Sequence, residues 1–380
     1  MASYGSNGWT IHAISWHIGR MGDASEHIDE LPPPTAPDSI PFSMRNFATE
    51  EGANHTANKL ASYIRLISRS LDLSRLDGVT VAYDYDAALA ELDRGVEGLR
   101  PLSRSNDDQL IGVGMAPAVL RDGVVKVHIV LNAPYVKEID KDEGDEPDGE
   151  FWAALYLLAH ECGHVQVTSD KDRAFPGMIL QHAVSSYEEA IFMQINEACW
   201  EEYAACRLSA VFGHGRLQLY EESLRGVLGV ARERAADARK DFWLHRDLNR
   251  AVAEVAPPLV EPLRLASYVL GHIDGLGDDT SISEETKQAI ADAGYTDFVD
   301  DLARALRSLW EIRPEWTHIS QFDIIGDVAR DALWSGGLTI RPAANAGATI
   351  NVWEPDEVDP VDMGLEMTWF ATGGRNSETA

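Results

Sequence analysis

The sequence predicts an α+β fold. A small core of helices and a short mixed sheet with an edge strand is followed by a mostly helical C-terminal region. Apolar residues recur at helical spacing in residues 53–73. Short segments rich in β-branched residues follow, and a turn signal at residues 121–123 separates the last two. Residues 216–335 then return to a helical pattern.

The predicted core begins with a helix and a strand. In residues 53–73, apolar positions such as Ile64 and Ile67 are three or four apart, which places them on one face of an amphipathic helix. The next segment, GVTVAYDY at residues 78–85, is typical of a short strand. A short helix is expected after it. Two apolar runs within residues 108–136 flank Arg121-Asp122-Gly123 and predict a β-hairpin.

Two long helices are predicted next. The stretch FWAALYLLAHECGHVQV, residues 151–167, is apolar on nearly all sides, so its helix should be buried. A second helix is expected over residues 185–212. The helical pattern that follows is interrupted at Pro257-Pro258, at residues 271–279 and at Gly294.

The last predicted element is a hairpin or a pair of edge strands in the tail, where residues 337–355 read GLTIRPAANAGATINVWEP. The chain is therefore divided into four segments: an irregular Pro- and Gly-rich arm (1–50), a core (51–215), a helical domain (216–335) and a β-prone tail with a flexible C-terminus (336–380).

The charge of the chain restricts its partners. It has 32 Lys and Arg against 62 Asp and Glu, a net charge of −30. Such an excess repels nucleic-acid phosphates and anionic lipid surfaces, so we expect no direct binding to nucleic acid or membrane. No window is long and apolar enough to cross a bilayer, and the N-terminus lacks a signal-peptide pattern. We expect a cytoplasmic protein whose oligomeric state the sequence does not indicate.

The three cysteines, Cys162, Cys199 and Cys206, are too few for a disulfide framework. All lie in predicted helices, and we expect small core residues that stay reduced. A redox-sensitive thiol beside a metal is an alternative for Cys162, because this residue lies inside the motif described next.

The stretch AHECGH, residues 159–164, has the spacing of a metal-binding helix. His160 and His164 are one helical turn apart, so both imidazoles can reach one ion. Glu161 points to the side of the ion and can take a proton from a metal-activated water. Gly163 leaves space for another backbone or for substrate. The alternative is a pair of hydrogen-bonded core histidines, which would leave three polar groups on an apolar helix.

A catalytic zinc needs a third protein ligand and an open position. The helix expected at 185–212 offers Glu197, and Glu201 lies one turn later on the same apolar face. We expect Glu197 to bind the metal and Glu201 to accept a hydrogen bond from a ligand histidine. Glu202 is expected to face solvent.

HECGH followed by the glutamate of NEACWE resembles the gluzincin metallopeptidases, in which a glutamate on a second helix completes the site. The order of elements and the stretch EEYAACRLSA are similar to the small core of the ImmA/IrrE-like peptidases. The resemblance covers residues 53–212. It implies that the strand at 126–136 is the edge strand on which an extended peptide pairs.

These observations predict a zinc metallopeptidase with Zn²⁺ as cofactor and a protein or peptide as substrate. The resemblance implies an intracellular regulatory protease with limited cleavage of a protein partner. A group that stabilises the oxyanion is not identified; the candidates by chain proximity are Tyr187, Tyr203, His214 and His182. The alternatives are a non-catalytic, metal-stabilised binding or scaffold protein and a metal or redox sensor.

Overall fold

The computed structural model describes residues 32–104, 112–140, 149–213, 215–277, 280–355 and 368–369. Most of the predicted N-terminal arm, the end of the C-terminal tail and His214 lie outside these residues. The described residues form two compact units. The first contains Met1–His182, Glu201–Leu219 and Val269–Ser281, and the second contains Ala183–Trp200, Tyr220–Tyr268 and Ile282–Ala380.

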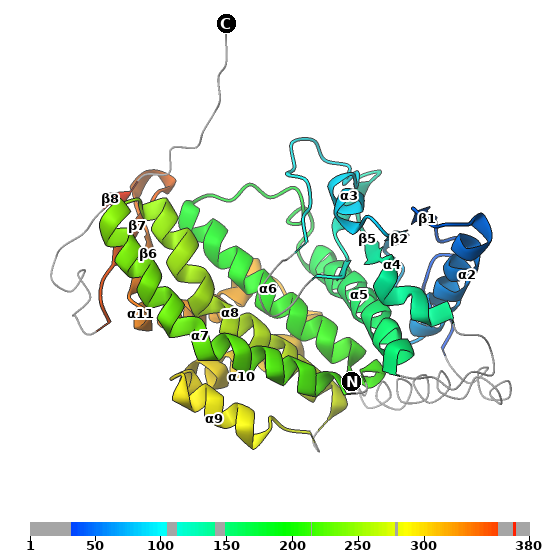
Figure 1. The fold of residues 1–380 in the computed structure, drawn as a ribbon. Coiled ribbons are helices and arrows are strands. Elements are labelled where there is room, and N and C mark those ends of the chain that lie inside the picture. Colours follow the sequence, from blue (N-terminus) through cyan, green and yellow to red (C-terminus); the bar gives the residue numbers. More distant parts are fainter. Residues whose placement is uncertain are drawn as a thin grey trace, which may run out of the picture. The chain divides into compact units, whose positions relative to one another are not determined.

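The first unit holds the mixed sheet and the helices around it (Figure 1). Its elements are β1 (Phe42–Arg45), α2 (Glu50–Ile67), β2 (Leu76–Ala82), α3 (Tyr85–Ala90), β3 (Gly114–Met115), β4 (Ala118–Arg121), β5 (Val124–Asn132), α4 (Ala133–Val136), a 3-10 turn (Lys137–Asp140), α5 (Gly149–Ala174), the end of α6 (Tyr187–Ser209) with the turn Ala210–Phe212, the start of α7 (Arg216–His245) and the end of α8 (Leu248–Leu276). The predicted α+β class is confirmed.

The sheet has the order β1-β2-β5-β3, and β4 also pairs with β5. Strands β1, β2 and β5 are parallel, whereas β3 and β4 run antiparallel to β5. The strand at 126–136 was expected at the edge, but β5 lies inside the sheet. The edge beside β5 is formed by β3 and β4, because the chain turns back and pairs there before it enters β5.

The hairpin of β4 and β5 is confirmed. Arg121 pairs with Val124, which leaves Asp122 and Gly123 as a two-residue turn. Both have positive φ, 52° and 77°. This is the combination that a type I′ turn requires, and Asp-Gly adopts it readily.

The first unit has buried side chains on both faces of the sheet, and a smaller cluster around Tyr85 includes Ala82 and Val130 on one of them. Other strand residues face the opposite side. The register pairs Val79 with Ile129 and Val81 with Leu131, so these four side chains share a face, and each is fully buried. Helix α5 contacts β5, and α2 contacts α5. The helix with the AHECGH stretch therefore lies directly on the sheet, as its apolar sequence predicts.

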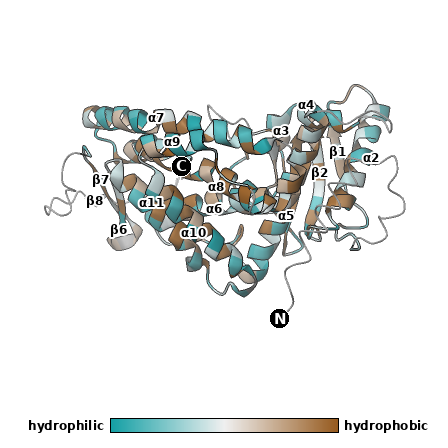
Figure 2. Cartoon of the chain, turned by 90° about the horizontal axis from the view of Figure 1, so that it is seen from below, coloured by the Kyte–Doolittle hydropathy of each residue, from teal (hydrophilic) through white to brown (hydrophobic). Residues whose placement is uncertain are grey.

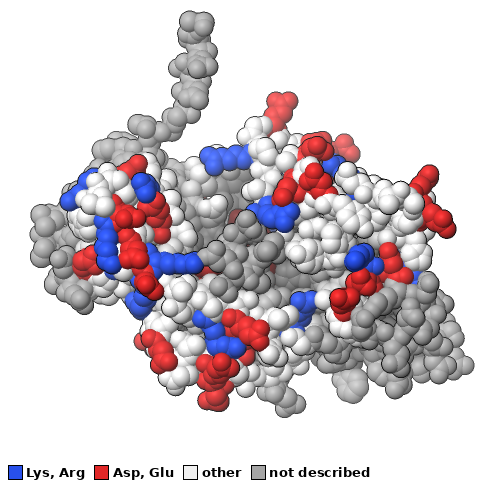
Figure 3. Space-filling view, viewed as in Figure 1, with Lys and Arg blue, Asp and Glu red and all other residues white. Residues whose placement is uncertain are grey.

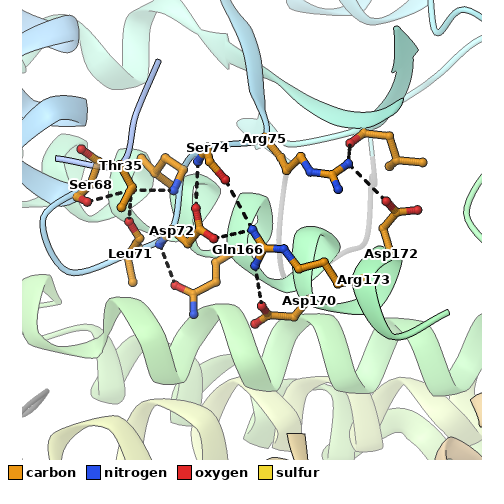
Figure 4. A network of polar contacts seen from close by, with 12 residues as sticks. Thr35, Ser68, Leu71, Asp72, Ser74, Arg75, Gln166, Asp170, Asp172 and Arg173 are labelled. Carbon is orange, nitrogen blue, oxygen red and sulfur yellow. Dashed lines mark hydrogen bonds and ion pairs between the residues drawn. The ribbon is translucent and has the colours of Figure 1, made fainter. Parts of the chain in front are cut away.

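A polar network fixes the second half of α5 to the loop between α2 and β2 (Figure 4). Arg173 Nη2 is 2.6 Å from Asp72 Oδ2, and Arg75 Nη1 is 3.2 Å from Asp172 Oδ2. The backbone N–H of Asp72 donates to Gln166 Oε1. These contacts hold α5 against the sheet at the end that follows the motif.

The second unit is mostly helical. It includes the first part of α6, most of α7 (Arg216–His245) and α8 (Leu248–Leu276), and then α9 (Glu284–Asp292), α10 (Thr296–Glu311), two 3-10 turns (Arg313–Glu315 and Ile319–Phe322), α11 (Asp323–Ser335), β6 (Leu338–Pro342), a third 3-10 turn (Ala344–Ala346), β7 (Ala348–Val352) and β8 (Thr368–Trp369). Brown and teal residues alternate along α7 and α11 in Figure 2, as expected of helices with one buried face. Because α6, α7 and α8 each contribute to both units, this division differs from the predicted segments.

The predicted interruptions of the helical region are only partly correct. Helix α8 continues through Pro257-Pro258, where a break was expected. Val255, Leu259 and Leu263 around them are almost fully buried, and this packing overrides the local preference of proline. The break at Gly294 is confirmed, because this residue has a φ of 70° between α9 and α10.

The predicted hairpin of the tail is confirmed by the antiparallel pair of β6 and β7. On the face shown in Figure 3, Asp and Glu side chains are interspersed with Lys and Arg, so the acidic excess forms no single patch there. Among the described helices, none is both long and apolar enough to span a membrane.

Candidate metal centre

The centre is built by α5 and the end of α6, both in the first unit. At Gly163 of α5, a Cβ would lie 3.1 Å from the Cα and the O of Ala205 on α6. The glycine thus allows the two helices to approach closely, as expected from the sequence. The face of α6 that meets α5 carries Glu202, Ala205, Cys206 and Ser209, which recur at helical spacing.

Three side chains meet between these helices: His160, His164 and Glu202. Their potential ligand atoms all lie within 4.8 Å of one another. The Nε2 atoms of the two histidines are 3.2 Å apart. Oε2 of Glu202 is 3.3 Å from Nε2 of His160 and 3.7 Å from Nε2 of His164.

This group fits a tetrahedral metal ion. Ligand bonds of about 2.0–2.2 Å place two tetrahedral ligand atoms about 3.3–3.6 Å apart, close to the three distances given above. Two imidazole nitrogens and one carboxylate oxygen are also a donor set that zinc accepts in catalytic sites. The group could therefore hold a metal ion, and it would leave one tetrahedral position open.

The electrostatics couple the carboxylate to the histidines. Burial would raise the pKa of Glu202, but hydrogen bonds from His160 and His164 hold it well below its usual value. Burial would likewise lower the pKa of His164, but the hydrogen bond to Glu202 and the nearby negative charges raise it to about 9. Without a metal, an ion pair forms between His164 and Glu202.

Glu161 lies beside this group as a buried carboxyl. Its side chain is almost inaccessible, with a relative exposure of 4% for the residue. Burial raises its pKa, and the two histidines offset this only in part. Its Oε2 has no hydrogen-bond partner among the described residues. The carboxyl is thus next to the histidines and has one oxygen available for a further donor.

The other oxygen of Glu161 lies over strand β3. A Cβ on Gly114 would be 2.5 Å from Glu161 Oε1 and 2.9 Å from Leu157 Cδ1. Only a residue without a side chain leaves the carboxyl in this position. Gly114 was not identified from the sequence, because its role depends on the register of β3 against β5.

The backbone of Gly114 points to the open side of the sheet. In the antiparallel pair, Asn132 N–H donates to Val113 O, so the next position, Gly114 opposite Leu131, is a non-hydrogen-bonded pair. Its N–H and C=O therefore point away from β5. Among the described strands, none pairs with this side of β3.

Farther along the same edge, two outward backbone groups of β4 are already used. The N–H of Leu120 donates to Arg94 O, and Arg94 Nε donates to Ala118 O. These contacts occupy part of the edge beyond Gly114.

The third member of the group is Glu202, not the predicted Glu197. Five positions on a helix correspond to about 140° of rotation and about 7.5 Å along the axis, so the two carboxylates cannot face the same point. The prediction placed the contact face of α6 on the wrong side, and Glu202 was wrongly expected to face solvent. The small residues opposite Gly163 were the signal that could have identified it.

Glu201 also differs from its prediction. It was expected to accept a hydrogen bond from a ligand histidine, but its Oε1 lies 3.0 Å from Nζ of Lys171. Lys171 lies two turns after His164 on α5 and is 3% exposed. A buried ammonium needs a partner, and Glu201 supplies it.

For the four candidates for oxyanion stabilisation, the role stays a prediction. Tyr203 is fully buried, and its hydroxyl donates to Asp274 Oδ2 at 2.7 Å. Tyr187 precedes Glu202 by fifteen positions, or about 22 Å along α6. His182 is exposed between α5 and α6. His214 lies outside the described residues.

All three cysteines are free and buried. Burial raises the pKa of Cys162, which opposes formation of a reactive thiolate. Cys206 lies at the centre itself: its Sγ is 3.8 Å from Nδ1 of His160 and receives a hydrogen bond from the hydroxyl of Tyr156 at 3.7 Å.

Comparisons with known proteins give no relative. No protein-family model matches the chain, and searches among curated proteins and among solved structures also return no match. The function must therefore be argued from the geometry of the centre.

Proposed function

We propose that the protein is a zinc-dependent metallopeptidase that hydrolyses peptide bonds, with His160, His164 and Glu202 as the metal ligands. The observation that carries the proposal is Glu161. A carboxyl that is 4% exposed is costly unless it has a function or a partner, and this one lies beside a three-ligand group with an open position. The resemblance to gluzincins, based on HECGH, supports the same reaction.

The chemistry is divided between the metal and one side chain. A zinc ion bound there would act as a Lewis acid and lower the pKa of a bound water towards ~7. Glu161 would take the proton from this water and deliver it to the leaving amine. Burial raises the pKa of Glu161, which makes its carboxylate a stronger base than an exposed one.

The substrate would bind along the edge of the sheet at β3. The N–H and C=O of Gly114 point outward next to Glu161, so they can pair with the backbone of an extended peptide. This edge takes the role that was expected of residues 126–136. As the resemblance implies, we propose limited cleavage of a protein partner inside the cell.

The first experiment tests the metal ligands by measuring bound zinc in the purified full-length protein. We expect one zinc per chain in the wild type and loss of stoichiometric zinc in Glu202→Gln. Glu197→Gln is the matched control on the same helix and should keep its zinc. If Glu197→Gln loses zinc and Glu202→Gln does not, the ligand assignment is wrong.

The second experiment separates an enzyme from a metal-stabilised scaffold. Glu161→Gln should keep zinc and abolish hydrolysis of a peptide library, because it removes only the base. A wild type that holds zinc but cleaves no peptide in the library and no protein in a cell extract would favour the scaffold. The buried cysteines argue against the redox sensor.

A further inference from the structure

The imidazole of His160 must be held in one orientation for the proposed centre to work. Its Nε2 faces the other two ligands, at 3.2 Å from His164 Nε2 and 3.3 Å from Glu202 Oε2. A neutral imidazole that binds a metal through Nε2 carries its proton on Nδ1. Nδ1 of His160 is therefore a donor, and its acceptor fixes both the tautomer and the ring.

Sulfur occupies the place of this acceptor. Sγ of Cys206 lies 3.8 Å from Nδ1 of His160, a distance that a weak hydrogen bond to sulfur allows. The hydroxyl of Tyr156 donates to the same sulfur at 3.7 Å. Cys206 is fully buried, so water does not compete for these contacts.

The chain places Cys206 there through the phase of α6. Cys206 lies one turn after Glu202, on the face that meets α5 at Gly163. The residue that the sequence suggested for this role, Glu201, pairs with Lys171 instead. The carboxylate of the group, Glu202, faces Nε2 and not Nδ1.

We propose that Cys206 is a positioning residue of the metal centre: its sulfur accepts the hydrogen bond from Nδ1–H of His160 and so presents Nε2 of that ring to the metal. The inference rests on the metal site of the proposed function. Because a thiol is a weaker acceptor than the carboxylates or carbonyls that usually fill this place, the zinc affinity should be tunable from this one position.

The test is the zinc dissociation constant of the full-length protein, measured by competition with a chromophoric chelator. Cys206→Ala removes the acceptor and should weaken zinc binding about tenfold. Alanine is compatible with the helix and leaves only a small cavity, so this variant should fold. Cys199→Ala is the matched control, since Cys199 is buried two turns earlier on α6; its zinc affinity should remain within about twofold of the wild type.

A second variant tests whether a better acceptor at this position raises the zinc affinity, which a role in packing alone would not predict. In Cys206→Asp, a carboxylate of similar volume would face the same two donors, Nδ1–H of His160 and the hydroxyl of Tyr156. We expect it to bind zinc more tightly than Cys206→Ala, by about tenfold or more. A merely structural cysteine would make the aspartate variant the worse of the two.

The outcomes separate this inference from the proposed function. Equal zinc affinities of Cys206→Ala, Cys199→Ala and wild type overturn the inference alone, and so does an aspartate variant that binds no better than the alanine variant. A wild type that binds no zinc overturns both. If the zinc affinities follow the predicted order but the protein hydrolyses no peptide, the positioning role is supported and only the peptidase proposal is wrong.

Discussion

At the scale of single residues, Glu202 and His164 decide how the centre competes for protons. In the metal-free protein, Glu202 raises the pKa of His164 to about 9 and is itself held ionised. A zinc ion needs the neutral imidazole, so it must displace the proton of His164. Glu202 therefore has a positive partner in both cases: protonated His164 in the metal-free protein, and the metal ion when it is bound.

We expect zinc binding to release about one proton from His164 at pH 7 and to tighten about tenfold per pH unit up to pH ~9. Calorimetry in two buffers of different ionisation enthalpy measures the release. In the metal-free protein, Glu202→Gln should lower the pKa of His164, which an NMR titration of the imidazole measures. An affinity that is flat between pH 6.5 and 8.5 would contradict the assignment.

The same pair predicts how the stability of the metal-free protein depends on pH. The raised pKa of His164 stabilises the fold fully below its ordinary value of 6.5, and this contribution is lost as pH rises towards 9. The lowered pKa of Glu202 stabilises the fold above its ordinary value of 4.5, and this contribution is lost as pH falls. Urea unfolding in the presence of a chelator should show that this pair contributes most to the free energy of unfolding between pH 4.5 and 6.5.

Gly114 offers a test of how the base is held. In Gly114→Ala, the new methyl group would displace the carboxyl of Glu161, whose Oε1 is 2.5 Å from the Cβ position. Since the flexible end of a side chain can move, we expect intact zinc binding and at least a tenfold lower kcat in peptide hydrolysis. Gly149→Ala, on the same unit in open space, is the control. Equal activities would show that this contact is unimportant.

Residue roles were the least predictable part of the centre. HECGH identified His160, Glu161 and His164, because the spacing of the three depends only on helix geometry. Glu202, Gly114 and Cys206 depend on which face of α6 meets α5 and on the register of β3. Neither is encoded by a local motif. A stripe of apolar residues favoured Glu197, and only the small residues that can pack against Gly163, such as Ala205, pointed to the face of Glu202.

At the scale of elements, close helix packing depends on glycines within α8. A Cβ on Gly271 would lie 2.2 Å from Tyr203 O on α6, and one on Gly275 would lie 2.3 Å from Arg207 O. Both pairs belong to the first unit. The predicted interruption at residues 271–279 begins too early: α8 continues through these two glycines, where the contact demands small residues, and ends at Leu276.

Gly271→Ala should therefore destabilise the protein by about 1–3 kcal/mol, since a backbone oxygen cannot move aside as a side chain can. Gly229→Ala, on an exposed part of α7 with nothing within 4 Å, should instead stabilise it by about 0.5–1 kcal/mol. Urea unfolding followed by circular dichroism measures both. A neutral Gly271→Ala would mean that the two helices are not in contact as described.

The elements themselves were largely predictable. Long periodic helices, the Asp122-Gly123 hairpin and the tail hairpin carry their signals in local sequence. Strand β1 was missed, because FSMR shows no alternation and its pairing with β2 is a long-range contact. The strand order was missed for the same reason, because no local sequence pattern indicates that β3 and β4 pair with the outer side of β5.

At the scale of the whole molecule, all three proposed ligands belong to the first unit. Zinc binding to the folded chain alone stabilises it by mass action, by about 2.7 kcal/mol at a free zinc concentration one hundred times the Kd. We expect a chelator to lower the Tm of the wild type and to leave that of Glu202→Gln unchanged. An identical Tm of the wild type with and without zinc would argue against a centre at these residues.

The short open edge at Gly114 has a consequence for selectivity. Arg94 occupies two outward backbone groups of β4, which shortens the stretch of edge with which a bound chain can form hydrogen bonds. A small number of backbone hydrogen bonds binds a peptide weakly and does not distinguish one sequence from another. For the proposed peptidase we therefore expect a high KM for unstructured peptides and tighter binding of a specific protein that also contacts other surfaces.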